Sequence, residues 1–274
     1  MRKSIYILMA LLLAACEPQL PNSPETLVIE GWIENGAAPV VFVTSSVSTS
    51  FQEQSINDLI DHVSTTADVS ITYNGVKYQL VGTITDDYFL PFYYTSNTLK
   101  GKIGGTYHLQ VNWKGMHAEA TTSILTPGSI DSIIVEDHPY IDTSYVVKAH
   151  ITPSADIQYY RFFSMAVGKD STFLPSYNGT FDSKLHTDDF FAVNRGRNNP
   201  ILDADFYYSY GDSVRFKLAT MDATAYDFWT RYDENMMFSH AALIPYASNL
   251  QTNIQGGLGY WFGYGITTYT TKIK

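Results

Sequence analysis

Residues 26–36 read TLVIEGWIENG, an alternating apolar strand that runs directly into a turn, and this stretch sets the class of the fold. Asn35-Gly36 is a strong hairpin signal, because both residue types tolerate the positive φ angles of a tight turn. Residues 40–44, VVFVT, supply the returning strand. The arrangement recurs with Asn74-Gly75 between residues 68–73 and 76–81, and with Lys114-Gly115 between residues 106–113 and 116–124. Repeated short hairpins of this kind predict a mainly β protein with antiparallel sheets.

The spacing of the hairpins also predicts the domain organisation. Six or seven short strands within residues 26–126 are typical of a β-sandwich of immunoglobulin-like or transthyretin-like type. Pro127-Gly128-Ser129 interrupts the pattern, so we place a boundary there and assign residues 127–274 to a second domain. That domain is expected to be a β-sheet with one packed α-helix at residues 222–238 and a long loop at residues 169–205. A short helix is also expected near residues 55–62.

The late helix and the last strand carry the clearest patterns of the second domain. Thr220 or Asp222 can cap the start of the helix, and an apolar stripe at helical spacing follows, made of Tyr226, Trp229 and Met236 or Met237. Residues 256–265, GGLGYWFGYG, place glycine repeatedly in a predicted strand. Glycine at such positions permits a positive φ or the close approach of another backbone.

The first 22 residues, MRKSIYILMALLLAACEPQLPN, have the pattern of a targeting segment. The apolar run at residues 7–13 is shorter than the roughly 20 residues that span a bilayer. Leu13-Ala14-Ala15-Cys16 resembles the lipobox of bacterial lipoproteins, in which the chain is cut before the cysteine and the cysteine is lipidated. The resemblance implies a signal peptide at residues 1–15, a lipid anchor on Cys16 and a proline-rich tether at residues 16–25. Cys16 is the only cysteine, so no internal disulfide is expected.

The chain is acidic, which excludes some classes of partner. It carries 17 basic and 27 acidic residues, a net charge of −10, and loss of Arg2 and Lys3 with the signal peptide changes this charge to −12. Nucleic acids and anionic membrane surfaces are bound by clustered lysine and arginine, and no such run occurs here. We therefore expect no nucleic-acid partner, and contact with the membrane through the N-terminal lipid.

Three segments together resemble a family of Bacteroidota envelope lipoproteins, the domain-of-unknown-function 4249 type. They are residues 27–33 soon after Cys16, residues 225–229 (AYDFW) and residues 248–261 (SNLQTNIQGGLGYW). Members of this family are often encoded beside TonB-dependent outer-membrane receptors. The resemblance implies an outer-membrane lipoprotein that assists such a β-barrel receptor in nutrient uptake, on either the periplasmic or the cell-surface face. It implies no catalytic residues and no cofactor.

No residue pattern in the chain specifies a reaction. Gly-x-Ser-x-Gly and His-Glu-x-x-His are absent, and the seven histidines are scattered singly. His108 and His117 lie on one predicted hairpin, but two such imidazoles are more often surface residues than ligands, so no metal site is predicted. Asp86-Asp87 and Asp188-Asp189 lack the spacing of a calcium loop. A hydrolase with carboxylates distant in sequence stays a third and weaker alternative.

Aromatic residues are the remaining clue to function, because the chain contains 21 Tyr, 15 Phe and 4 Trp. Consecutive aromatic residues on a strand point to opposite faces, so the groups at residues 92–94 and 206–208 are not expected to be core throughout. Amphipathic tyrosine rings, and the pair of arginines near residue 196, suit contact with a ligand or a partner. The predicted contact residues are Tyr93, Tyr94, Tyr177, Arg195, Arg197, Tyr207 and Tyr208.

These observations favour a non-enzymatic lipoprotein that captures a small-molecule or peptide ligand, or contacts a receptor, through aromatic loops. The alternative hypothesis is a surface adhesin or a glycan-binding β-sandwich. The two differ in one observable property: an adhesin binds its target as a soluble ectodomain alone, which a receptor accessory need not do.

Overall fold

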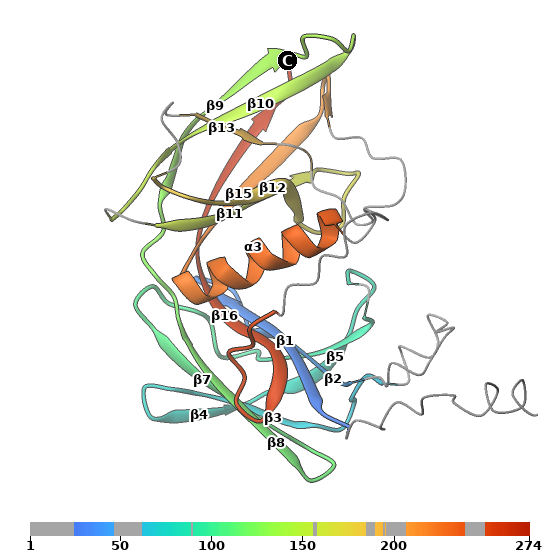
Figure 1. Ribbon diagram of the computed structural model, residues 1–274, viewed down its shortest axis with the longest axis vertical. Coiled ribbons are helices and arrows are strands. Elements are labelled where there is room, and N and C mark those ends of the chain that lie inside the picture. The colour runs from blue at the N-terminus through green and yellow to red at the C-terminus, as the bar shows by residue number, and fades with distance from the viewer. Residues whose placement is uncertain are drawn as a thin grey trace, which may run out of the picture.

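The computed structural model describes residues 25–46, 62–88, 90–155, 158–184, 190–193, 195, 207–238 and 250–274 (Figure 1). Cys16, the tether up to residue 24 and nearly all of the short helix expected near residues 55–62 lie outside the described residues. The described chain is mainly β, with several sheets and one helix, which confirms the predicted fold class. No helix in this part of the chain combines the length and the apolar character needed to cross a membrane.

The described residues form three sheets. The largest has eight strands in the order β12-β11-β15-β16-β1-β2-β6-β5, and a second has four strands in the order β4-β3-β7-β8. The third has the order β13-β10-β14, and β9 also pairs with β10. The strands are β1 (Leu27–Glu34), β2 (Val40–Ser45), β3 (Asp68–Tyr73), β4 (Val76–Gln79), β5 (Val81–Ile84), β6 (Phe92–Thr95), β7 (Thr106–Trp113), β8 (Met116–Ser123), β9 (Ser129–Asp137), β10 (Ser144–Thr152), β11 (Tyr159–Ala166), β12 (Leu174–Asp182), β13 (Phe190–Val193), β14 (Tyr208–Ser209), β15 (Ser213–Met221) and β16 (Gly257–Lys272).

The three predicted hairpins are present as β1–β2, β3–β4 and β7–β8, each with antiparallel pairing. Asn74 and Gly75 have φ angles of 49° and 75°, and Lys114 and Gly115 have φ angles of 49° and 79°. These left-handed turn residues fit the right-handed twist of the strands they join. The local turn chemistry therefore accounts for the second and third hairpins as the sequence predicts, whereas in the first hairpin only Gly36 of the Asn35-Gly36 pair has a positive φ, 80°.

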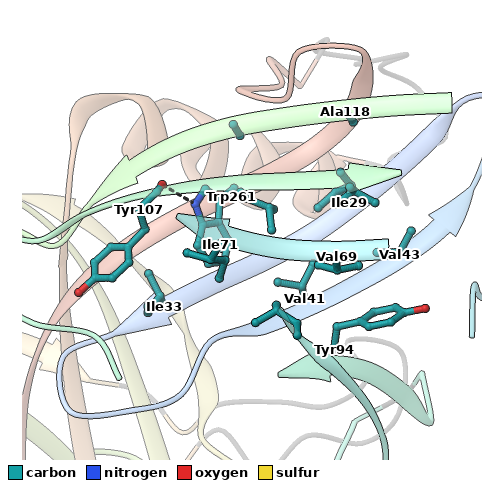
Figure 2. Close-up of a cluster of buried hydrophobic side chains, with 14 of the residues drawn as sticks. Ile29, Ile33, Val41, Val43, Val69, Ile71, Tyr94, Tyr107, Ala118 and Trp261 are labelled. Atoms are coloured by element: carbon teal, nitrogen blue, oxygen red, sulfur yellow. Dashed lines mark hydrogen bonds between the residues drawn. The ribbon is translucent and has the colours of Figure 1, made fainter. Parts of the chain in front are cut away.

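The first core lies between the four-stranded sheet and the β1–β2 part of the eight-stranded sheet (Figure 2). Ile29 and Val41 on one sheet and Val69 and Leu109 on the other are fully buried. Two sheets packed face to face through alternating inward residues form a β-sandwich, which confirms that part of the predicted fold. The last strand enters the same core, because the buried Trp261 donates a hydrogen bond from Nε1 to the Tyr107 carbonyl oxygen at 3.1 Å (Figure 2).

A second core lies between the β9–β10–β13–β14 sheet and strands β11, β12 and β15. Two of its strands, β12 and β13, fall inside the segment 169–205, which the sequence analysis assigned to a loop, so that assignment is wrong for residues 174–182 and 190–193. The polar composition suggested a loop, but β12 pairs with β11 and β13 pairs with β10. Tertiary pairing here overrides the weak local preference of Ser, Asn and Asp for turns.

Strand β16 connects the two cores. Its first half, Gly257 to Tyr264, pairs in parallel with β1, and its second half, Gly265 to Lys272, pairs antiparallel with β15. In Figure 1 this red strand runs from the lower sheets to the upper ones. It therefore belongs to both regions that the sequence analysis separates at residue 127, and the boundary itself stays a prediction.

The predicted late helix is α3 (Ala223–Phe238), which crosses the middle of the molecule (Figure 1). Asp222 caps it, because its Oδ1 accepts a hydrogen bond from the Ala225 N–H at 2.8 Å. Of the helix residues with described side chains, Ala225 and Phe228 are the most buried, in a cluster with residues of β15 and β16. Tyr226 and Trp229 of the predicted stripe are half-buried beside them, and the side chains of Met236 and Met237 lie outside the described residues.

Candidate functional site

A cleft of about 540 Å³ opens between α3 and the sheet face that packs against it. The floor of the cleft is one face of the sheet. Side chains alternate along β1, so Leu27 and Ile29 point into the first core and Glu30 points to the opposite face, where the cleft lies. In the same way Tyr260 faces α3, while its neighbour Trp261 faces the first core. Glu30 and Tyr260 are register partners on β1 and β16, so they lie side by side. The lining residues are Val28, Glu30, Arg161, Pro175, Phe228, Trp229, Tyr232, Leu250, Thr252, Leu258, Gly259 and Tyr260.

Aromatic rings form one wall of the cleft. The Trp229 ring centroid lies 5.1 Å from that of Tyr260 and 5.4 Å from that of Tyr232, in edge-on contacts, and Phe228 lies 5.1 Å from Tyr260. Trp229 donates a hydrogen bond from Nε1 to the Tyr264 hydroxyl at 2.7 Å, which fixes its ring at the far edge. Rings held by both packing and a hydrogen bond make this wall rigid.

Arg161 is a charged residue that is only 4% exposed. Its Nη2 donates to Asp233 Oδ1 at 3.1 Å, its guanidinium lies 3.9 Å from the Trp229 ring centroid, and Thr180 donates to Asp233 Oδ2 at 2.7 Å. The Nη1 of Arg161 is buried and has no hydrogen-bond partner among the described residues. A buried donor without an acceptor is costly, and Arg161 is one of the residues that line the cleft.

Glu30 is the acidic group of the cleft. Its side chain is accessible from the cleft, but the surrounding walls remove part of its hydration. This loss of hydration disfavours the ionised form and raises the pKa of the Glu30 carboxyl. Within the described ranges, no basic side chain forms an ion pair with it. Burial likewise raises the pKa of the Tyr232 and Tyr260 hydroxyls, so both stay protonated at neutral pH and can donate hydrogen bonds.

Arg161 and Glu30 are not among the contact residues predicted from the sequence. A signal for both was present, because each is the single charge in an apolar strand segment: Glu30 in LVIEGWI and Arg161 in YYRFFSMA. Isolated charges in such segments are rarely fully buried unless they are paired. The sequence alone does not bring the two together, because β1, β11 and α3 are distant in the chain.

The predicted contact residues whose side chains the structure describes do not line the cleft. Tyr94 is 3% exposed in the first core, where its hydroxyl donates to the Ser64 carbonyl oxygen at 3.2 Å and accepts from the Ala67 N–H at 2.7 Å. Tyr208 is 1% exposed in the second core. Both side chains thus offer no surface to a ligand or partner.

Tyr93, Arg195 and Tyr207, which are the other predicted contact residues with described side chains, each have different neighbours. Tyr93 is half-buried against Phe42, with ring centroids 5.8 Å apart, and Tyr207 lies 4.4 Å from the His138 ring. Arg195 pairs with Asp170 at 3.4 Å. Tyr177 lies on β12, but its side chain, like Arg197 as a whole, lies outside the described residues.

The two histidines of the third hairpin share one acidic neighbour. Glu119 Oε2 lies 3.4 Å from His108 Nε2 and 3.6 Å from His117 Nε2. The Nδ1 atoms are hydrogen bonded to Thr121 and Asn112. Across the part of the chain that the structure describes, no group of three or more metal-ligating side chains is arranged to hold an ion.

No curated protein matches the chain. Similar solved structures include a cytokine receptor complex, with 9% identity, a TM-score of 0.25, and 73% of this chain and 85% of that chain covered. Another is the FN1–FN3 domains of chicken CNTN1, with 9% identity, a TM-score of 0.27, and 71% and 60% covered. The family model described as "Domain of unknown function (DUF4249)" matches residues 15–270, and the chain belongs to this family.

Proposed function

We propose that this protein is a non-enzymatic lipoprotein of the cell envelope that captures a ligand in the α3 cleft and works with a TonB-dependent β-barrel receptor of the outer membrane. The lipobox pattern at Cys16 supports the anchor. The resemblance to lipoproteins encoded beside such receptors supports the partner. The cleft supports ligand capture, because it joins rigid aromatic walls to a few polar groups, as small-ligand sites do.

The observation that carries the proposal concerns Arg161, which lines the cleft and whose Nη1 has no hydrogen-bond partner among the described residues. Leaving a buried N–H without an acceptor costs about 1–3 kcal/mol, and a ligand oxygen at this position removes that cost. Walls that are already ordered lose little conformational freedom when a ligand binds. The folded protein is thus prepared for a ligand in advance.

The cleft supports binding better than hydrolysis. Paired carboxyl groups on either side of the scissile bond carry most glycoside hydrolysis, and a nucleophile beside a base carries most acyl transfer. Among the described lining residues, Glu30 is the single carboxyl, and it lies beside Tyr260 rather than beside a second acid. The cleft therefore offers one acidic group and one guanidinium to hold a ligand.

The receptor partnership is tested by purification of the tagged, lipidated protein from its native membrane in mild detergent, followed by mass spectrometry. We expect a β-barrel receptor to be recovered in comparable amount. The matched control is Cys16→Ser, which removes the lipid and is expected to lower receptor recovery, since the protein is no longer held at the membrane. A lipidated protein recovered alone, in several detergents, contradicts the partnership.

A specific observation also favours the adhesin hypothesis as a second candidate. Tyr140 is 91% exposed and lies beside His138, which also contacts Tyr207, and Tyr210 is 72% exposed and lies beside Tyr145. Exposed tyrosines of this kind suit contact with glycans or proteins. The test is an array of glycans and host proteins probed with the soluble ectodomain. Binding that is lost in a Tyr140→Ala, Tyr210→Ala variant supports the adhesin, and an array without any binding removes it.

A further inference from the structure

We propose that the α3 cleft binds an uncharged apolar peptide segment through one of its backbone amides. In this arrangement Arg161 donates from Nη1 to the peptide carbonyl oxygen, Glu30 accepts from the peptide N–H, and the aromatic and aliphatic walls contact an apolar side chain. The inference rests on the proposed ligand-capture function and names the class of ligand.

The hydrogen-bonding groups of the cleft determine which donors and acceptors a complementary ligand must carry. Arg161 carries an N–H, at Nη1, that has no acceptor among the described residues, and Glu30 carries a carboxyl that has no basic partner among them. Hydroxyls of Thr252, Tyr232 and Tyr260 complete the set. The indole N–H of Trp229 is already used by Tyr264. The remaining described lining residues carry no polar side chain: Val28, Pro175, Phe228, Leu250, Leu258 and Gly259.

The charge balance argues against an anionic ligand. The charge of Arg161 is already compensated by Asp233, which in turn accepts a hydrogen bond from Thr180. Among the described residues Glu30 has no such compensation, so their charges at the cleft sum to a net negative charge when Glu30 is ionised. A carboxylate, phosphate or sulfate group therefore meets repulsion from Glu30, whereas a neutral donor such as an amide N–H does not.

The apolar walls argue against a hydroxyl-rich ligand. A glycan carries many hydroxyl groups, and each one that is buried without a partner costs free energy. An amide group needs only one acceptor and one donor, which match Glu30 and the free Nη1 of Arg161. Peptide amides also alternate with side chains, so one bound amide carries an apolar side chain to the wall formed by Trp229 and Tyr260.

The experiment uses the mature, lipidated protein in detergent micelles. The probe is a pool of acetylated, amidated tripeptides whose middle residue is varied over the aliphatic and aromatic amino acids, so that no terminal charge is present. Binding is measured by equilibrium dialysis with mass spectrometry, and the best peptide is then titrated by calorimetry. We expect saturable binding of at least one aliphatic or aromatic member.

Two bulky substitutions locate the site. Leu258→Trp fills the cleft and is expected to weaken binding at least tenfold, because Leu258 lines it. Val81→Trp is the matched control, since Val81 on β5 is similarly exposed, at 49% against 48% for Leu258, but lies outside the cleft. We expect it to bind like the unaltered protein. Thermal unfolding of each variant verifies that it is folded.

A further pair of changes tests the amide contact itself. Glu30→Leu removes the acceptor and is expected to weaken binding at least fivefold. N-methylation of the peptide amide removes the donor and is expected to weaken binding to the unaltered protein, but not to weaken binding to Glu30→Leu any further. Arg161→Lys keeps a positive charge for Asp233 while it removes the planar second N–H, and a similar loss is expected.

The outcomes separate the two levels of the proposal. If the peptides do not bind but a panel of glycans or small apolar compounds does, and Leu258→Trp removes that binding, ligand capture stands and the peptide inference is overturned. If peptides bind equally well to Leu258→Trp, the cleft is not their site and the inference is likewise overturned. If nothing in either panel binds, ligand capture in this cleft is overturned as well.

Discussion

The substitution Gly259→Ala tests whether the close pairing of β16 with β1 requires glycine at this position. Gly259 has a φ angle of +97°, and a Cβ at this position overlaps the carbonyl oxygen of Ile29, its register partner on β1. Ile29 is fully buried in the first core, so the packed side chain restrains the backbone from moving away. Gly259→Ala therefore introduces both a disfavoured backbone angle and a steric overlap.

The two effects have separate magnitudes. A residue other than glycine at positive φ costs about 1–2 kcal/mol, and an added methyl in a packed site costs about 1–3 kcal/mol. We expect Gly259→Ala to lower the free energy of unfolding by about 2–5 kcal/mol, a large part of the roughly 5–15 kcal/mol of a typical protein. Gly36→Ala isolates the first effect, because Gly36 has φ +80° and its Cβ meets nothing within 4 Å. Gly263→Ala isolates the second, because its Cβ meets the Ser123 carbonyl oxygen without a positive φ.

The assay is urea unfolding of the chain from residue 17 onward, followed by tryptophan fluorescence. A shift of the midpoint at constant slope reports a change in the free energy of unfolding. The expected order of loss places Gly259→Ala above both single-effect variants. If Gly259→Ala loses no more stability than Gly36→Ala, the contact with Ile29 does not restrain β16 and the reasoning is refuted.

Three further predictions concern other contacts. Trp261→Phe removes the hydrogen bond to the buried Tyr107 carbonyl oxygen and is expected to cost about 1–3 kcal/mol in urea unfolding; an unchanged midpoint contradicts this. Asp222→Ala removes the cap of α3 and is expected to cost about 1 kcal/mol, whereas Asp222→Asn costs less because the amide oxygen still caps. The raised pKa of Glu30 means that its contribution to stability is fully present below its unfolded pKa and is lost as pH rises through the folded pKa. The melting temperature of Glu30→Gln is therefore expected to exceed that of the unaltered protein increasingly from pH 4 to pH 7, and a gap independent of pH speaks against it.

Local chemistry made much of the fold predictable, and distance in the chain limited the rest. The turns at Asn74-Gly75 and Lys114-Gly115 carry their own conformational preference, so the strands beside them could be placed from the sequence. The parallel pairing of β1 with β16 joins Leu27 to Gly257, and no local pattern specifies such a partner. Strands β12 and β13 were missed because their order depends on pairing with β11 and β10.

The candidate site was less predictable than the fold. Alternation shows that a strand has two faces, but it does not show which face a second sheet covers. Tyr94 and Tyr208 were selected for their aromatic rings, yet both face a core. Glu30 and Arg161 line a cleft only because folding brings α3 and β16 beside them, and these elements are distant in the chain.

The glycine-rich signature at the end of the chain connects stability with the site. Asn253 holds Trp261 by two hydrogen bonds, accepting from its N–H at 2.9 Å and donating to its carbonyl oxygen at 2.8 Å. Gly259 lets the same strand approach β1 closely, and this pairing sets Tyr260 beside Glu30 on the cleft floor. Because the strand that completes the first core also forms the cleft, a substitution that loosens it lowers stability and displaces the cleft residues together. Variants with altered binding must therefore be compared at equal folded fraction, which makes the exposed cleft residue Leu258 a better probe of function than any glycine of the signature.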